Sequence, residues 1–397
     1  MNESPANLAA NPALNPARFA RLGLADVADK ALAGERLSME DGERLFACPD
    51  PTALGALAHA ARTRLHGRKT FFVVNRHLNY TNVCVNGCLF CAYRRERGEA
   101  GAFSLTLADA EAKVAATPED TAEIHVVGGC HPDLGLAFFE ELLSAVKRLR
   151  PRAVLKCFTA VEIAHFARLE GLTIREVLAR LKAAGLAMLP GGGAEIFDPE
   201  VRGRICPRKL TAAEWLAVHR EAHAMGIRTN CTMLFGHLET RRHRLEHLEA
   251  LRRLQDETGG FTCFIPLPFQ TENSALKGIT PVTGLEELRT IAVSRLMLDN
   301  IRHIKAYWVM LGVRQAQAAL HFGADDLDGT VVEEKIGHMA GARSEMALTR
   351  AELMAMIRDC GFTPVERDSL FNELSEPGHS GRSRQIGQAE SVPEEVA

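Results

Sequence analysis

Three cysteines, Cys84, Cys88 and Cys91, lie within a stretch of eight residues. Thiolates are the usual ligands of iron–sulfur clusters, and a [4Fe–4S] cube has four iron corners. Three closely spaced cysteines would fill three corners and leave one iron without a protein ligand. An open coordination position lets a metal centre bind a small molecule, as catalytic zinc sites do. The spacing therefore predicts a cluster that takes part in chemistry, and Gly87 would let the backbone approach it closely.

A zinc site is the alternative for the same three cysteines. It would need a distant fourth ligand such as His77 or His131. Structural zinc usually has two paired Cys-x2-Cys elements, and this chain has no second pair. The other cysteines stand singly, and we interpret each as a small buried hydrophobic side chain. They are Cys48, Cys130, Cys157, Cys206, Cys231, Cys263 and Cys360.

The composition is that of an ordinary globular enzyme. Of the 397 residues, 46% are hydrophobic and 24% are charged, and the formal net charge is −3. This balance provides no basic field of the kind that nucleic acids require, so we expect no nucleic-acid partner. No apolar run reaches the roughly 20 residues that span a bilayer, and the N-terminal segment lacks the features of a secretory signal. We therefore expect a cytoplasmic protein whose cysteines stay reduced.

The elements that must position these cysteines follow from the hydrophobic pattern. Residues 1–65 predict an N-terminal helical extension, and in 66–365 short apolar runs alternate with longer amphipathic segments. We predict strands at 69–75, 123–128, 153–158, 187–190, 228–235, 261–266, 303–310 and 319–324. Eight strands alternating with helices predict an α/β fold, a (β/α)8 TIM-type barrel, with a doubly wound open sheet as the alternative. Residues 366–397 are predicted to form a disordered tail.

Polar and glycine-rich segments follow the predicted strands. They are YTNVCVNGCLFC, GGCHPD, TAVE, PGGGAE, GHLET, PLPFQTEN and GADDLDGT. The C-terminal ends of the strands of a parallel barrel meet at one face, and that face carries the active site. The pattern therefore predicts a single active site at the mouth of the barrel.

The motif CVNGCLFC, with Phe90 before its last cysteine and Tyr93 beyond it, resembles the signature of the radical S-adenosylmethionine (SAM) superfamily. The resemblance implies that the open iron binds the amino and carboxylate groups of SAM. It also implies that an electron from a donor such as flavodoxin or ferredoxin cleaves SAM, giving methionine and a 5′-deoxyadenosyl radical. Cofactors of this kind supply the difficult chemistry, while the protein positions and shields the reacting groups.

Longer segments resemble the menaquinone-pathway (futalosine) group of that superfamily, over roughly residues 40–365. They include NRHLNYTNVCVNGCLFCAYRR, PGGGAEIFDPEVRGRICPRKL and GADDLDGTVVEEKIGHMAGA. Within the group the chain looks most like the aminofutalosine synthase family, with cyclic dehypoxanthinyl futalosine synthase and FO synthase-like enzymes as alternatives. Cys130 departs from the family pattern, which has an aliphatic residue there.

The family resemblance implies a transferase that uses SAM as a co-substrate. The 5′-deoxyadenosyl group would add to 3-[(1-carboxyvinyl)oxy]benzoate, with migration of the aryl group and loss of the carboxyl group. The products would be 6-amino-6-deoxyfutalosine, methionine and bicarbonate. Cyclic dehypoxanthinyl futalosine synthase would instead use SAM to abstract hydrogen and release 5′-deoxyadenosine.

This chemistry suggests ligands for SAM. Gly128 and Gly129 can offer backbone groups without a Cβ in the way, although a plain turn is the other interpretation. Tyr93 is a candidate for contacting adenine. Glu162 is a further candidate for binding SAM, and Glu195 is a candidate catalytic carboxylate able to bind ribose hydroxyls or a proton.

The two substrate carboxylates require cationic or hydrogen-bond-donating partners. The candidates are the basic side chains near predicted strand ends, namely Arg76, His77, Arg94, His131 and His237. A solvated surface charge or a structurally satisfied histidine is the competing interpretation for each of them.

Overall fold

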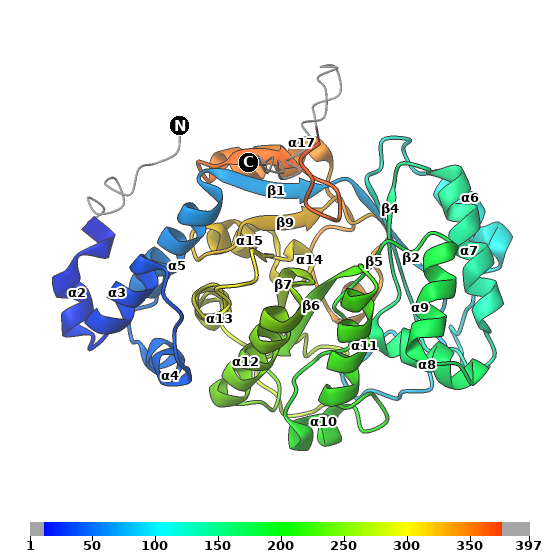
Figure 1. The fold of residues 1–397 in the computed structure, drawn as a ribbon, viewed down its shortest axis with the longest axis horizontal. Helices are drawn as coiled ribbons and strands as arrows, with labels where there is room; N and C mark the ends of the chain where they lie inside the picture. The colour runs from blue at the N-terminus through cyan, green and yellow to red at the C-terminus, as the bar shows by residue number, and fades with distance from the viewer. Residues whose placement is uncertain (1–11, 375–397) are drawn as a thin grey trace, which may run out of the picture.

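The computed structural model describes residues 12–374 and has a ring of parallel strands surrounded by helices (Figure 1). The strands are β1 (Lys69–Val73), β2 (Asn75–Asn79), β3 (Glu123–Val127), β4 (Val154–Cys157), β5 (Met188–Leu189), β6 (Arg228–Phe235), β7 (Phe261–Pro268), β8 (His303–Ile304), β9 (Asp326–Gly329) and β10 (Thr363–Glu366). The helices are η1 (Pro12–Leu14), α2 (Pro16–Arg21), α3 (Ala25–Ala33), α4 (Met39–Ala47), α5 (Pro51–His66), α6 (Leu107–Ala115), α7 (Leu136–Leu149), α8 (Ala160–Glu170), α9 (Ile174–Ala183), α10 (Pro199–Ile205), α11 (Ala212–Ala224), α12 (Arg241–Thr258), α13 (Gly284–Met297), α14 (Trp308–Leu311), α15 (Val313–Leu320), α16 (Ile336–Ala340) and α17 (Arg350–Asp359).

Parallel pairing closes the strands into a barrel. β2 to β8 pair in chain order, while β1 pairs with β9 on one side and with the outer strand β10 on the other. Lys305, directly after β8, forms a parallel bridge with Asp326 of β9. β1 and β2 are two parts of one extended run, separated only by Val74, so this run joins β9 to β3. The predicted barrel is therefore confirmed, and the open sheet is excluded.

The last two predicted strands are only partly correct. Of 303–310, only His303–Ile304 is a strand, and Trp308–Leu311 form α14. The eighth strand is Asp326–Gly329, whereas 319–324 cover the end of α15 and a turn. The hydrophobic pattern does not predict this strand, because its buried side chains include acidic ones whose charges are neutralised by cations. The carboxylate of Asp326, for example, lies 2.6 Å from the guanidinium of Arg367.

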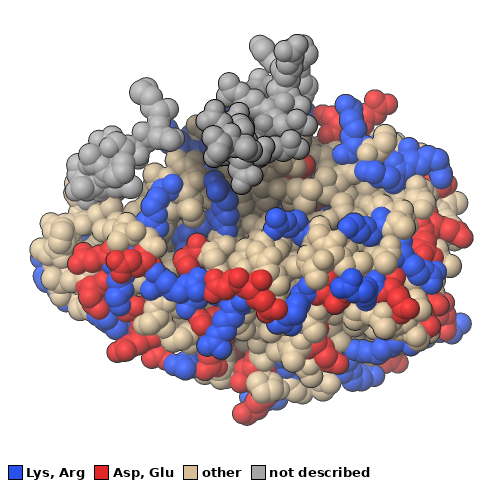
Figure 2. All heavy atoms as spheres, viewed as in Figure 1, with Lys and Arg blue, Asp and Glu red and all other residues tan. Residues whose placement is uncertain are grey.

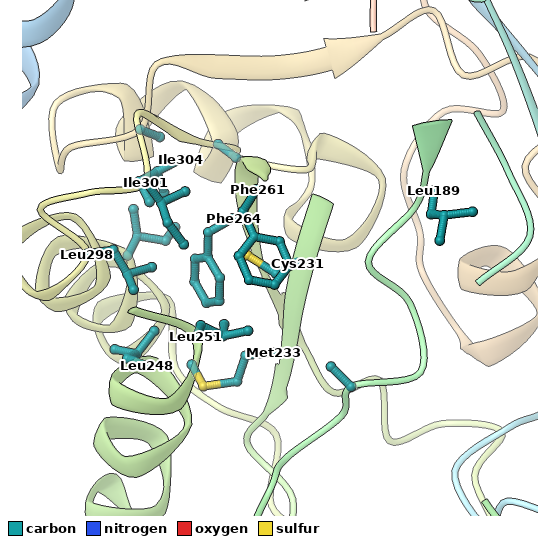
Figure 3. Close-up of a cluster of buried hydrophobic side chains, with 14 of the residues drawn as sticks. Leu189, Cys231, Met233, Leu248, Leu251, Phe261, Phe264, Leu298, Ile301 and Ile304 are labelled. Atoms are coloured by element: carbon teal, nitrogen blue, oxygen red, sulfur yellow. The ribbon is translucent and has the colours of Figure 1, made fainter. Parts of the chain in front are cut away.

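Alternation along β6 separates the core from the barrel interior. Cys231 and Met233 point outward and pack near Leu248 and Leu251 of α12 (Figure 3). The intervening Asn230, Thr232 and Leu234 line a cavity inside the barrel. Successive side chains of a strand point to opposite faces, so one strand builds both the core and the cavity wall.

The ends of the described chain pack on the barrel. Helices α2 to α5 lie on one flank, where α5 runs against α13 (Figure 1). Beyond β10, Arg367 and Ser369 are buried, so the packed chain continues past residue 365, where we predicted that the barrel core ends. Residues 1–11 and 375–397, which include most of the predicted tail, lie outside the described residues.

The surface carries both signs of charge. Lysine and arginine intermingle with aspartate and glutamate over the face shown in Figure 2, in line with the small net charge. Between residues 12 and 374, no helix has the length and apolar character needed to cross a membrane.

Candidate active site

A cavity of about 330 Å³ lies at the C-terminal ends of the barrel strands. Six of the seven polar segments that follow predicted strands contribute to its wall. The exception is GHLET, where the carboxylate of Glu239 accepts hydrogen bonds from the backbone N–H groups of Gly236 and His237, at 2.6 and 2.9 Å. The prediction that these segments surround one cavity is therefore confirmed for all but GHLET.

The three clustered cysteines line this cavity, and their loop is held by backbone hydrogen bonds. The N–H of Cys84 donates to the carbonyl of Arg95 at 3.1 Å, and that of Val85 donates to the carbonyl of Cys130 at 3.1 Å. Gly87 has a φ of 61°, which glycine adopts without a steric penalty. The positive φ at this position of the loop therefore explains why residue 87 is a glycine.

The spacing of the sulfur atoms does not match the ligand set of a single zinc ion. A tetrahedral zinc with Zn–S bonds of about 2.3 Å would bring its sulfurs to about 4 Å from one another. Within residues 12–374, three metal-ligating side chains place their ligand atoms within 4.8 Å of one another, and these are His66, His303 and Asp325. The thiols of Cys84, Cys88 and Cys91 do not all come this close together. At least two of the three thiols thus lie farther apart than two ligands of one tetrahedral zinc ion would.

The His66, His303 and Asp325 group is an ion-pair cluster at the start of β8 and β9, away from the cysteines. The carboxylate of Asp325 already contacts the guanidinium of Arg295 and lies 2.6 Å from Nδ1 of His303. A buried carboxylate that a guanidinium already neutralises has little charge to offer a metal. We therefore assign this group to the stability of the barrel.

The thiols differ in their protonation. Burial raises the pKa of Cys88 to about 12, and burial also raises that of Cys91. The pKa of Cys84 is lowered, chiefly by its interaction with the neighbouring thiol of Cys130. Because thiolates are the ligands of iron, binding of iron must release the protons of Cys88 and Cys91.

Gly128 and Gly129 bring the end of β3 against the cysteine loop. The N–H of Gly129 donates to the carbonyl of Thr81 at 2.9 Å. A Cβ at Gly129 would lie 2.3 Å from the carbonyl oxygen of Val83, and one at Gly128 would lie 2.8 Å from the ring of Tyr80. Both glycines are thus required by the packing of the protein itself. Their predicted contact with SAM stays a prediction.

Glu162 holds the same junction from the next strand. Its carboxylate accepts hydrogen bonds from the N–H of Gly128 at 3.0 Å, from Oη of Tyr80 at 2.8 Å and from the N–H of Thr159 at 2.7 Å. These contacts make Glu162 a positioning residue of the cavity wall. Burial raises its pKa to about 7.

This raised pKa predicts a pH-dependent contribution of Glu162 to stability. The ionised carboxylate is disfavoured in the fold, so its contribution is complete below the ordinary pKa of 4.5 and is lost as the pH rises to about 7. We expect the free energy of unfolding of the wild type, minus that of Glu162→Gln, to fall by up to about 3 kcal/mol across this window. Urea denaturation of both proteins across the window measures the difference, and a constant difference would refute the prediction.

Glu195, the predicted catalytic carboxylate, lines the cavity in a strained conformation with a φ of 50°. Its Oε1 lies 2.5 Å from Nζ of Lys209, and both side chains are largely buried. Lys209 also lies over the ring of Phe90 in the cysteine loop, 5.3 Å from the ring centroid. The carboxylate is therefore held by a cation beside the cysteine loop.

Two buried polar atoms in this cavity wall have no hydrogen-bond partner. They are Oη of Tyr93 and Nε2 of His77. Buried polar atoms are almost always satisfied, so these two indicate a ligand in the cavity. His77 stacks on His125 with ring centroids 4.5 Å apart, and burial lowers its pKa to about 3. His77 is therefore neutral and can act as a hydrogen-bond donor or acceptor but not as a countercharge.

The other predicted carboxylate ligands divide between the cavity and the surroundings. Arg94 lines the cavity, and its Nε donates to the carbonyl of Cys84 at 3.2 Å. Arg76, His131 and His237 are not part of the wall. Arg76 forms an ion pair with Glu333 at 3.1 Å. Only His77 and Arg94 of the five predicted residues are thus placed to meet a ligand in this cavity.

The polar floor of the cavity was missed by the sequence analysis. Nζ of Lys156 lies 2.7 Å from the carboxylate of Glu123, and Nζ of Lys305 lies 2.8 Å from that of Asp328. Both lysines are buried and line the cavity. A lysine within an otherwise apolar strand, as in AVLKCF and HIKAYWVM, is the signal that could have identified them.

Comparisons with known proteins agree with this geometry. Residues 78–251 match the model of the radical SAM superfamily, and residues 258–379 match the CofH/MqnC C-terminal region. The chain is 46% identical to the aminodeoxyfutalosine synthase of Thermus thermophilus over 358 residues, which cover 88% of this chain and 96% of that protein. It is 38% identical to the cyclic dehypoxanthine futalosine synthase of Streptomyces coelicolor over 356 residues, covering 88% and 89%.

A solved structure shares the fold. The crystal structure of methylornithine synthase matches with a TM-score of 0.69 at 18% sequence identity, covering 85% of this chain and 96% of that chain. Identity at this level is evidence of a common barrel architecture only.

Proposed function

Because this chain belongs to the radical SAM superfamily, and within it to the family of the aminodeoxyfutalosine synthases, we propose that it catalyses the aminodeoxyfutalosine synthase reaction. The adenosyl group of SAM is joined to 3-[(1-carboxyvinyl)oxy]benzoate, with aryl migration and loss of the carboxyl group. The products are 6-amino-6-deoxyfutalosine, methionine and bicarbonate. The observation that carries the proposal is the 46% identity over nearly the whole length of both proteins, together with the three thiols in the cavity wall.

Cys84, Cys88 and Cys91 would hold the [4Fe–4S] cluster, which supplies the electron that cleaves SAM. The donor set suits iron, because all three thiols line one wall and none of them forms a disulfide. The electron would come from a low-potential carrier such as flavodoxin or ferredoxin.

The residues beside the cysteine loop would bind SAM. Tyr93 offers a buried hydroxyl without a partner, and Gly128 and Gly129 place backbone groups next to the loop. Glu162 keeps Gly128 in place through its hydrogen bond, and the Glu195 and Lys209 ion pair provides a fixed charge of each sign. These groups are set before the ligand arrives, which lowers the cost of orienting it.

The apolar part of the wall suits the aromatic co-substrate. Leu234, Ile265, Leu267 and Phe269 line it, and His77 and Arg94 elsewhere in the wall can donate hydrogen bonds to the substrate carboxylates. An apolar enclosure with few polar groups excludes water from reactive intermediates. The protein thus orients the two molecules and shields them.

Mass spectrometry of products tests this proposal. The reduced enzyme, incubated without oxygen with SAM and 3-[(1-carboxyvinyl)oxy]benzoate, should form a product that contains the adenosine moiety covalently bound to the aryl group. Release of 5′-deoxyadenosine without such a product would contradict the proposal and would favour the hydrogen-abstracting reaction of a cyclic dehypoxanthine futalosine synthase.

A further inference from the structure

The cysteine loop exposes two aliphatic side chains on the outside of the barrel. Val85 follows Cys84, and Leu89 lies between Cys88 and Cys91, with 40% and 42% of their surfaces exposed. Other residues of the same loop, such as Asn86 and Tyr93, are buried. The loop therefore has an inner side that faces the cavity and an outer side that presents apolar surface to solvent.

Backbone contacts place this outer side between two neighbouring segments. The N–H of Leu89 donates to the carbonyl of Ile205 at 2.9 Å, and the N–H of Ala275 donates to the carbonyl of Leu89 at 2.9 Å. Arg204 precedes Ile205 at the end of α10, and Lys277 follows Ala275 by two residues. Leu89 is thus held between two segments that each carry an exposed cation, Arg204 and Lys277.

These cations lack ion-pair partners. Arg204, Arg208 and Lys277 are exposed, and none of them forms an ion pair with a carboxylate of residues 12–374. Exposed arginines elsewhere commonly have one, as Arg180 does with Glu140 and Arg220 with Glu257. The guanidinium of Arg208 lies over Gly87 and donates to the carbonyl of Asn86 at 3.3 Å, so this positive charge lies directly on the loop.

We propose that this surface, defined by Val85, Leu89, Arg204, Arg208 and Lys277, is the docking site of a small acidic protein that carries one electron. The inference rests on the proposed function, because it requires a cluster on the opposite side of the loop. An apolar centre with a charged rim is the usual composition of a transient protein interface, and unpaired cations attract an acidic partner. The carrier loses one electron and the cluster gains it, through the loop in which the exposed Val85 and Leu89 directly follow the ligands Cys84 and Cys88.

Stopped-flow absorbance of the reconstituted full-length enzyme tests the proposal, with reduced flavodoxin as the carrier and dithionite as the small-molecule reductant. The charge reversal Arg204→Glu/Lys277→Glu should lower the second-order rate of cluster reduction by flavodoxin roughly tenfold or more at low salt. The deficit should shrink at high salt, because salt screens exposed charges. Reduction by dithionite should proceed at the wild-type rate.

Two control variants test whether a slower reduction rate results from lost docking, from the change in net charge or from a disturbed fold. Arg204→Lys/Lys277→Arg should behave as the wild type. Arg180→Glu/Arg220→Glu has the same change in net charge on α9 and α11, and it should lose little of the flavodoxin rate. An unchanged rate for the charge reversal at α10, equal slowing with dithionite or equal slowing in the α9/α11 variant would overturn the proposal. So would a change in sedimentation showing that this surface joins two copies of the chain.

The test of the docking surface can fail independently of the test of the proposed function. Product formation driven by dithionite does not need the docking surface. If the wild type reduced by dithionite formed no aryl–adenosine product, the proposed function would fail, while the reduction rates would still decide the docking site.

Discussion

Replacing Cys84, Cys88 or Cys91 with alanine is expected to reduce product formation to background and to remove most of the iron and its visible absorbance. Each thiol lines the same cavity wall, and its removal would leave the [4Fe–4S] cube with two protein ligands instead of three. Iron analysis, visible absorption and product mass spectrometry on anaerobically reconstituted protein measure the three effects.

Cys360→Ala is the matched control. Cys360 is half-buried like the three loop cysteines but lies at the end of α17, where its thiol interacts with the carbonyl of Gln317 at 3.8 Å. Its replacement should leave iron content and product formation unchanged. Wild-type SAM cleavage by a variant of any loop cysteine would show that the ligand assignment is wrong.

Replacing Gly129 with alanine is expected to have the second-largest effect. The new Cβ would lie 2.3 Å from the carbonyl oxygen of Val83, which is backbone and cannot rotate away, so the chain before Cys84 must shift. Overpacking of this kind costs about 1–3 kcal/mol of stability. A displacement of about 1 Å at a reacting site can lower turnover about a hundredfold. Iron content, unfolding and turnover should therefore all decline.

Gly203→Ala tests whether this loss reflects the site or glycine replacement in general. Gly203 lies in α10, and a Cβ there would meet nothing within 4 Å. Alanine favours helix over glycine, so this variant should be as active and at least as stable as the wild type. If Gly129→Ala kept full iron and turnover, the close packing of β3 on the cysteine loop would have no functional role.

Local patterns predicted much of the fold and the centre of the site. The cysteine spacing identified the loop, and the apolar runs located most of the strands. β9 was misplaced because its residues are acidic, and cations that are distant in the sequence, such as Lys305 and Arg367, make their burial favourable. Lys209 was missed for a related reason, since its significance depends on Glu195, which lies fourteen positions earlier and is brought close by the fold.

Arg76, His131 and His237 lie outside the cavity wall, because sequence position does not show the direction of a side chain. His77 and Arg76 are neighbours on β2, and alternation sends His77 into the cavity and Arg76 toward Glu333. His237 follows β6, yet its Nε2 pairs with the carbonyl of Leu234 at 3.0 Å and so turns back on its own strand. The contacts that each side chain makes in the folded protein therefore decide whether it can reach a ligand in the cavity.

Mössbauer spectroscopy of the iron-57-reconstituted enzyme tests most directly whether one iron is left free to bind SAM. Addition of SAM should change the signal of one iron in four and leave the other three unchanged. A spectrum that SAM does not alter, or anaerobically purified protein that contains zinc in place of iron, would contradict a three-cysteine cluster with an open corner.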